Sequence, residues 1–73
     1  MKYLNPKLIG DKIKELRINA GYSQRELADG ICPQAQISKI ERGSVFPIAN
    51  TLFHISEKVG VDPTFSTLVQ HQN

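Results

Sequence analysis

The 73-residue chain lacks the features that would mark a secreted protein, a membrane protein or an enzyme. Its single cysteine, Cys32, can form no internal disulfide, which suits a reducing cytoplasm. No apolar run approaches the roughly 18 residues needed to cross a bilayer, and the first residues contain no signal-peptide core. A chain this short has little room for a buried cleft, and it shows no catalytic constellation or metal-ligand spacing. We therefore expect a cytoplasmic, non-enzymatic protein with no cofactor or metal.

The sequence also has no internal repeat, no low-complexity tract and no glycine-rich phosphate loop. Its formal net charge of +2 comes from nine Lys and Arg against seven Asp and Glu. So small an excess does not by itself indicate nucleic acid, and any such interpretation depends on where the charges lie. The hydrophobic fraction of 40% is ample for one small helical domain.

Apolar residues recur at helical spacing along the chain. A first helix is predicted after Pro6, from about Lys7 to Ala20, with the stripe Leu8, Ile9, Ile13, Leu16 and Ala20. Another is predicted from about Ile48 to Val59, with the stripe Ile48, Leu52, Ile55 and Val59. A short last helix should follow Asp62 and Pro63 and carry Phe65, Leu68 and Val69. With two helices between them, these predict an all-α, compact five-helix bundle forming one domain over 1–73, structured from about 7 to 70.

The middle of the chain predicts a helix-turn-helix. Ser23 and Glu26 have the spacing of a capping box, which starts a helix. Gly30 can take a positive φ and lets the chain reverse. Pro33 suits the first position of a second helix, and Gly43 ends that helix. Cys32 would then be the N-cap residue, and we expect it to be a small half-buried side chain rather than a redox-sensitive thiol.

The second of these helices, Pro33–Arg42, has one apolar side and one polar side. Ile37 and Ile40 define the buried side on a helical wheel. Ala35, Ser38, Lys39 and Arg42 fall on the opposite side, with Gln34 beside them at the N-terminal end. No acid lies on that side, and amide and basic side chains are the ones that read base edges in the major groove of DNA. The alternative is an ordinary solvated helix face.

These residues resemble a known family. The pattern SQxxLA, a turn, and then ISxIExG followed by a proline resembles the Cro/phage-repressor (XRE-type) helix-turn-helix, over Ile9 to about Leu68. Within that family, ELADGIC and ISKIERG most resemble the N-terminal DNA-binding domains of peptide-pheromone regulators of Gram-positive bacteria, the Rgg, PlcR and NprR group. One departure is the turn after Ala28, which is one residue shorter than the usual LAxxLGVS form.

The resemblance implies sequence-specific binding of double-stranded DNA by a transcriptional regulator. The implied base contacts are Gln34, Ala35 and Lys39. The implied contacts to the DNA backbone are Gln24, Arg25, Gln36, Ser38, Arg42 and Ser44. A methyl group at Ala35 can make only apolar contact, for which the thymine methyl is the natural target.

Arg17 lies at the border of the first helix's apolar stripe. In the phage-repressor family the arginine at this place pairs with the glutamate before the glycine that ends the recognition helix, which here is Glu41. The resemblance thus implies a structural salt bridge between Arg17 and Glu41. The alternative is a side chain that runs along the surface and keeps its guanidinium in water.

The expected partners are a palindromic DNA operator and a second copy of the chain. Candidate contacts between the copies are Phe53, Phe65, Leu68 and Val69. The resemblance also implies a longer regulator whose peptide-binding C-terminal domain would lie outside these 73 residues. The competing function is a helical adaptor, antitoxin-like or anti-repressor, that binds a protein through Phe53, Phe65 and Val69.

Overall fold

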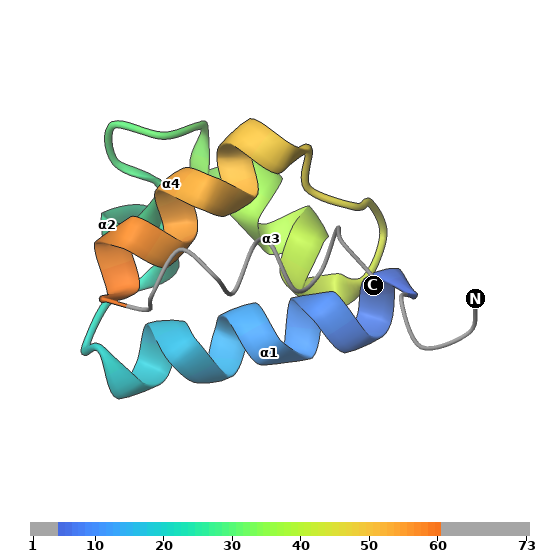
Figure 1. Cartoon of the computed structure of the whole chain (residues 1–73), viewed down its shortest axis with the longest axis horizontal. Coiled ribbons are helices and arrows are strands. Elements are labelled where there is room, and N and C mark those ends of the chain that lie inside the picture. Colours follow the sequence, from blue (N-terminus) through green and yellow to red (C-terminus); the bar gives the residue numbers. More distant parts are fainter. Residues whose placement is uncertain (1–4, 61–73) are drawn as a thin grey trace, which may run out of the picture.

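The computed structural model describes residues 5–60, and all regular structure in that range is helical. The four helices are α1 (Pro6–Asn19), α2 (Gln24–Ala28), α3 (Gln34–Arg42) and α4 (Ala49–Val59). α1 runs along one side of the domain, and α2, α3 and α4 gather on the other side of it (Figure 1). The all-α prediction is confirmed. The predicted fifth helix, after Asp62, lies outside the described residues.

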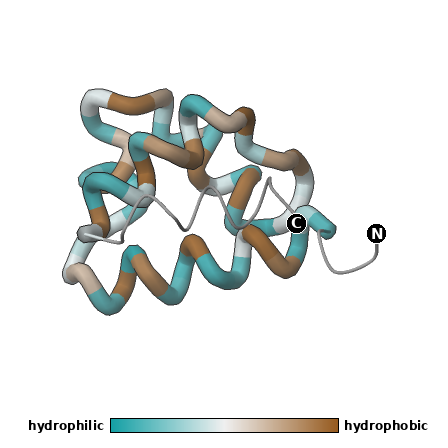
Figure 2. Tube along the Cα trace, viewed as in Figure 1, coloured by the Kyte–Doolittle hydropathy of each residue, from teal (hydrophilic) through white to brown (hydrophobic). Residues whose placement is uncertain are grey.

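The core is built from short aliphatic side chains contributed by all four helices. Its buried members are Ile9, Ile13, Leu27, Ala28, Ile37, Ile40, Leu52 and Ile55. Tyr22, Ile31, Cys32, Val45 and Val59 pack around them and are partly buried. Apolar and polar positions alternate along each helix, so each helix buries one side and leaves the other to solvent (Figure 2).

α1 and α3 approach each other closely because α1 has no side chain at Gly10. A Cβ built on Gly10 would lie 2.2 Å from the backbone oxygen of Ile40 and 2.9 Å from that of Glu41. At the end of α3, Gly43 has φ +82, and its own Cβ position would lie 2.8 Å from the Cα of Lys7. The two glycines thus set how closely α1 packs against α3.

The first two helices begin with side-chain caps. Asn5 accepts a hydrogen bond from the backbone N–H of Leu8 at 2.8 Å. Ser23 and Glu26 form the predicted capping box, with Glu26 N to Ser23 Oγ at 3.0 Å and Ser23 N to Glu26 Oε1 at 2.8 Å. The backbone N–H and hydroxyl of Ser23 hold the pKa of Glu26 below its usual value. Cap formation therefore fixes where the helix-turn-helix starts.

Three predicted helix starts differ from the structure by one residue, and the first is that of α1, which begins at Pro6 rather than at Lys7. Pro33 is the N-cap of α3, with ψ 148°, rather than its first residue, so Cys32 is not the cap. Proline fixes φ but leaves ψ free, and here ψ is extended. Cys32 is half-buried as expected, and burial raises the pKa of its thiol. Ile48 is likewise the N-cap of α4 and is 69% exposed, so it does not belong to the apolar stripe.

The predicted stripe of α1 was wrong at both ends. Leu8 is 51% exposed and Ala20 is exposed. The buried residues of α1 are Ile9, Gly10 and Ile13, and at Gly10 the backbone of α3 comes close to α1. Packing at these residues turns Leu8 outward, and Ala20 follows the end of the helix as its C-cap.

Candidate nucleic-acid interface

The turn between α2 and α3 is closed by backbone hydrogen bonds. The N–H groups of Ile31 and Cys32 both donate to the carbonyl oxygen of Ala28, at 2.8 and 3.0 Å. Gly30 has φ +81, a conformation that glycine adopts without steric cost. Ile31 turns inward and packs against the core. The short turn is thereby anchored at its middle, and α3 starts at Gln34 directly after it.

α3 presents an outward face without negative charge, which we call the α3 face: residues 34, 35, 38, 39 and 42. Gln34, Ala35, Lys39 and Arg42 are exposed, and Ser38 and the neighbouring Gln36 are half-buried. Glu41 is the only acid in the sequence from Gly30 to Ser56, and its side chain is only 4% exposed. No exposed carboxylate therefore accompanies the positive charges of Lys39 and Arg42 along α3.

Glu41 joins three helices through one buried carboxylate. Arg17 donates to it twice, from Nε at 2.7 Å and from Nη2 at 3.1 Å, while its Nη1 donates to the backbone oxygen of Tyr22 at 2.9 Å. Gln24 donates to the same carboxylate from Nε2 at 3.0 Å. The Arg17 side chain is 11% exposed. The structure thus contains the ion pair between α1 and α3, and it is shielded from water rather than lying on the surface.

The residues predicted to contact the DNA backbone lie on α2, on α3 and just after α3. Arg42 Nη1 donates to Ser38 Oγ one turn earlier, at 2.8 Å. Ser44, just beyond the end of α3, and Arg25 on α2 are exposed. Gln24 is half-buried and partly committed to Glu41, which sequence reasoning did not foresee. Its amide still has a second N–H for an external acceptor.

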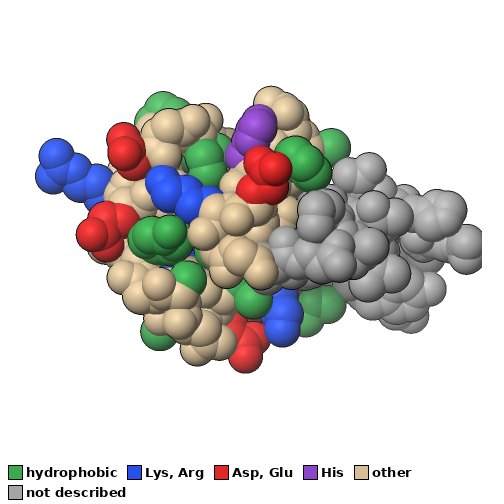
Figure 3. All heavy atoms as spheres, turned by 60° about the vertical axis from the view of Figure 1, so that its left-hand side comes forward, with side chains coloured by type: hydrophobic (Ala, Val, Ile, Leu, Met, Phe, Trp, Pro, Cys, Tyr) green, Lys and Arg blue, Asp and Glu red, His purple; other side chains and the backbone are tan. Residues whose placement is uncertain are grey.

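Sequence reasoning missed Lys58, in the last turn of α4. Lys58 Nζ donates to the carbonyl oxygens of Glu26 and Asp29, each at 2.7 Å, and lies 5.7 Å from the centre of the Tyr22 ring. The end of the domain formed by α2 and the last turn of α4 carries acidic and basic side chains side by side (Figure 3). No local pattern could have revealed this contact, because it joins residues that are 29 and 32 positions apart.

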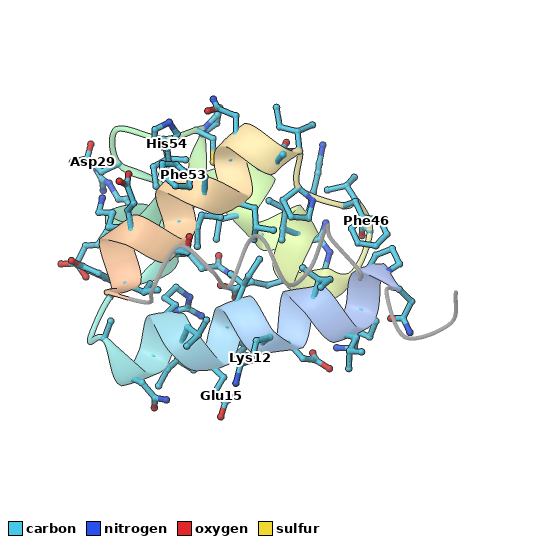
Figure 4. All side chains as sticks on the ribbon, viewed as in Figure 1. Lys12, Glu15, Asp29, Phe46, Phe53 and His54 are labelled. Carbon is cyan, nitrogen blue, oxygen red and sulfur yellow. The ribbon has the colours of Figure 1, made fainter. Side chains whose placement is uncertain are left out.

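The exposed phenylalanines do not form one contact patch. Phe46 is 47% exposed and Phe53 is 37% exposed. Phe46 lies in the loop after α3 and Phe53 on α4 beside His54, well apart from each other (Figure 4). Phe65 and Val69, the other members of the predicted adaptor surface, lie outside the described residues. Of the three residues predicted for the adaptor surface, the structure therefore describes Phe53 alone.

Residues 5–60 offer neither a membrane span nor a metal site. None of the helices in this range has the length and apolar character needed to cross a membrane. In the same range no three His, Cys, Asp or Glu side chains lie together in a way that could hold a metal ion.

Comparison with known proteins agrees with this architecture. Residues 13–66 match the model of a helix-turn-helix family. The fold matches the crystal structure of Bacillus thuringiensis PlcR in complex with the peptide PapR7 and DNA, with a TM-score of 0.78 and 30% sequence identity over 92% of this chain. The matched region is 24% of the PlcR chain. A comparison with curated proteins finds no match. The chain therefore belongs to the XRE-type helix-turn-helix family, a family of DNA-binding domains and not of enzymes.

Proposed function

We propose that the chain binds double-stranded DNA sequence-specifically as part of a transcriptional regulator, with α3 in the major groove. The observation that carries the proposal is the α3 face, which is exposed except at half-buried Ser38, contains no acid and belongs to a helix held by a buried ion pair. Gln34, Ala35 and Lys39 supply the base contacts. The contacts to the DNA backbone come from Gln24, Arg25, Gln36, Ser38, Arg42 and Ser44. The similarity to PlcR, whose structure includes DNA, supports this assignment.

We also propose that two copies bind one palindromic operator, since a helix as short as α3 reaches few base pairs. Dimer symmetry would place the half-sites about one helical turn, roughly 34–36 Å, apart or a multiple of that distance. A binding selection on random duplex DNA tests both proposals. Recovery of a palindromic sequence is the expected outcome. Recovery of no preferred sequence would contradict base reading, and a single asymmetric half-site as the full, tight target would contradict dimeric binding.

A longer regulator is a further part of the proposal. The chain spans about a quarter of the length of PlcR, and the share covered is 24%. We propose that these residues are the DNA-binding part of a cytoplasmic bacterial regulator that also has a peptide-binding domain. The proposal of a longer regulator is tested by the molecular mass of the protein in extracts of its own cells, detected with an antibody to this domain. A mass well above that of the 73 residues is the expected result.

Replacing Gln34 should relax base preference at one position in each half-site. Gln34 stands at the N-terminal end of α3, and its amide can donate to N7 and accept from the N6 amino group of one adenine. Gln34→Ala should cost about 1–3 kcal/mol for the preferred base and little for the others. Affinities for operators with single-base changes measure this effect. An equal loss for every base at every position would show that Gln34 does not read a base.

Replacing Arg42 should weaken binding to all sequences alike. Arg42 lies at the last residue of α3, next to Gly43, where the helix would leave the groove and meet a phosphate. Arg42→Ala should lower the slope of log affinity against log salt by about one unit. The measurement is a set of affinities at two salt concentrations, with Lys14→Ala as a control that removes an exposed charge on α1. A changed base preference at an unchanged slope would make Arg42 a base reader instead.

A further inference from the structure

Lys58 is not on the α3 face and is not among the residues assigned to DNA contacts. It is half-buried in the last turn of α4. Its two hydrogen bonds, both of 2.7 Å, end on the carbonyl oxygens of Glu26 and Asp29. Its ammonium is thus held against the C-terminal end of α2 by α4.

The end of α2 needs such a partner. The last carbonyls of a helix lack hydrogen-bond donors within the helix and carry partial negative charge. The carbonyl of Ala28 accepts from Ile31 and Cys32 in the turn. The carbonyls of Glu26 and Asp29 are the ones that Lys58 reaches, and an ammonium has three donors and the favourable charge.

We propose that Lys58 is a positioning residue for base reading: it caps α2 from α4 and fixes the start of the turn that leads to Gln34. The inference rests on the proposed function. α2 has five residues, too few to be stable as a helix without tertiary contacts. Asp29 is the C-cap of α2, and the turn from 29 to 33 leads directly into α3. Loss of the ammonium frees the last turn of α2 and lets the N-terminal end of α3 move.

The Tyr22 ring helps to hold the Lys58 side chain against the end of α2. The ammonium lies 5.7 Å from the ring centre, within the range of a cation–π contact. Tyr22 precedes the Ser23 cap of α2, and its carbonyl oxygen accepts a hydrogen bond from Arg17 Nη1. Lys58 therefore contacts Tyr22, just before the Ser23 cap, as well as carbonyl oxygens at the end of α2, and the pair of Arg17 and Glu41 separately joins α1 to α3.

The test compares Lys58→Met with Lys14→Met in the full chain. Both variants lose one positive charge, but Lys14 is exposed on α1. The first readout is base discrimination. It is the ratio of the affinity for the selected duplex to the affinity for the same duplex in which the base contacted by Gln34 has been changed. Lys58→Met should reduce this ratio about fivefold, which is less than the whole discrimination that a bidentate contact supplies. The slope of log affinity against log salt should stay unchanged. Lys14→Met should leave the ratio unchanged.

A second readout is amide hydrogen exchange of Ile31 and Cys32, which should quicken in Lys58→Met and not in Lys14→Met. If Lys58→Met does not fold, Lys58→Gln replaces it, and a smaller loss of discrimination is expected because the amide keeps a donor but not the charge. Discrimination equal to that of the wild type in the folded variant would overturn the inference alone. A salt slope lowered by about one unit at constant discrimination would also overturn it, because Lys58 would then contact a phosphate. A wild-type protein without base discrimination would instead overturn the proposed function, and the inference with it.

Discussion

Glu41→Ala should cost about 3–5 kcal/mol of unfolding free energy, because it leaves the shielded guanidinium of Arg17 without its counter-ion. The same change removes the acceptor of Gln24. A loss of this size is a large fraction of the ~5–15 kcal/mol that stabilises an ordinary domain. Chemical denaturation of the wild type and the variant measures the difference.

Glu15→Ala is the matched control. Glu15 pairs with Lys12 at 3.4 Å on the outer side of α1, and the two side chains are 60% and 51% exposed. Both point away from the body of the domain (Figure 4). Removal of such an exposed pair should cost about 0–1 kcal/mol. Equal losses for Glu41→Ala and Glu15→Ala would show that the shielded pair contributes no more than a surface one.

Gly10→Ala should destabilise the domain by about 2–3 kcal/mol, although alanine favours an ordinary helix over glycine by about 0.5–1 kcal/mol. The reversal comes from the 2.2 Å that would separate the new Cβ from the backbone oxygen of Ile40. A backbone atom cannot rotate aside, so α1 must move away from α3. Thermal melting measures the change.

The sign of the Gly10→Ala effect tests whether α1 and α3 are in close contact at this glycine. A variant more stable than the wild type would show that α1 and α3 are not in close contact at this glycine. Gly21→Ala provides a comparison, because Gly21 has φ +83 but no neighbouring atom within 4 Å of its Cβ position. Gly21→Ala should lower the free energy of unfolding by about 1–2 kcal/mol, and only because alanine is strained in the left-handed backbone conformation.

Much of the fold could be predicted because local signals agree with each other. The spacing of Ser23 and Glu26 predicted a capping box, and the structure contains both of its hydrogen bonds. Gly43 ends α3 in the left-handed conformation, as its place after the apolar residues of that helix indicated. Helix starts were less certain, because a proline such as Pro33 fits both the cap and the first turn.

Contacts between helices could not be predicted from local patterns. The predicted apolar stripe of α1 consisted of its aliphatic residues. The backbone of α3 nevertheless packs closely against α1 at Gly10, which has no side chain. A glycine inside a helical pattern was an available signal for close packing. The bonds of Lys58 and the bond from Gln24 to Glu41 depend on how α2 meets α4 and α3, and no periodicity encodes that. The ion pair of Arg17 was expected only through family resemblance.

The most direct test of DNA reading by the α3 face is the salt dependence of binding to the selected duplex and to a scrambled duplex of equal length. If Lys39, Arg42 and their neighbours neutralise phosphates, log affinity should fall linearly with log salt, with a slope of about −0.9 per phosphate contacted. The selected duplex should bind more tightly than the scrambled one at every salt concentration. Binding that does not change with salt, or equal affinity for the two duplexes, would contradict sequence-specific DNA binding by this domain.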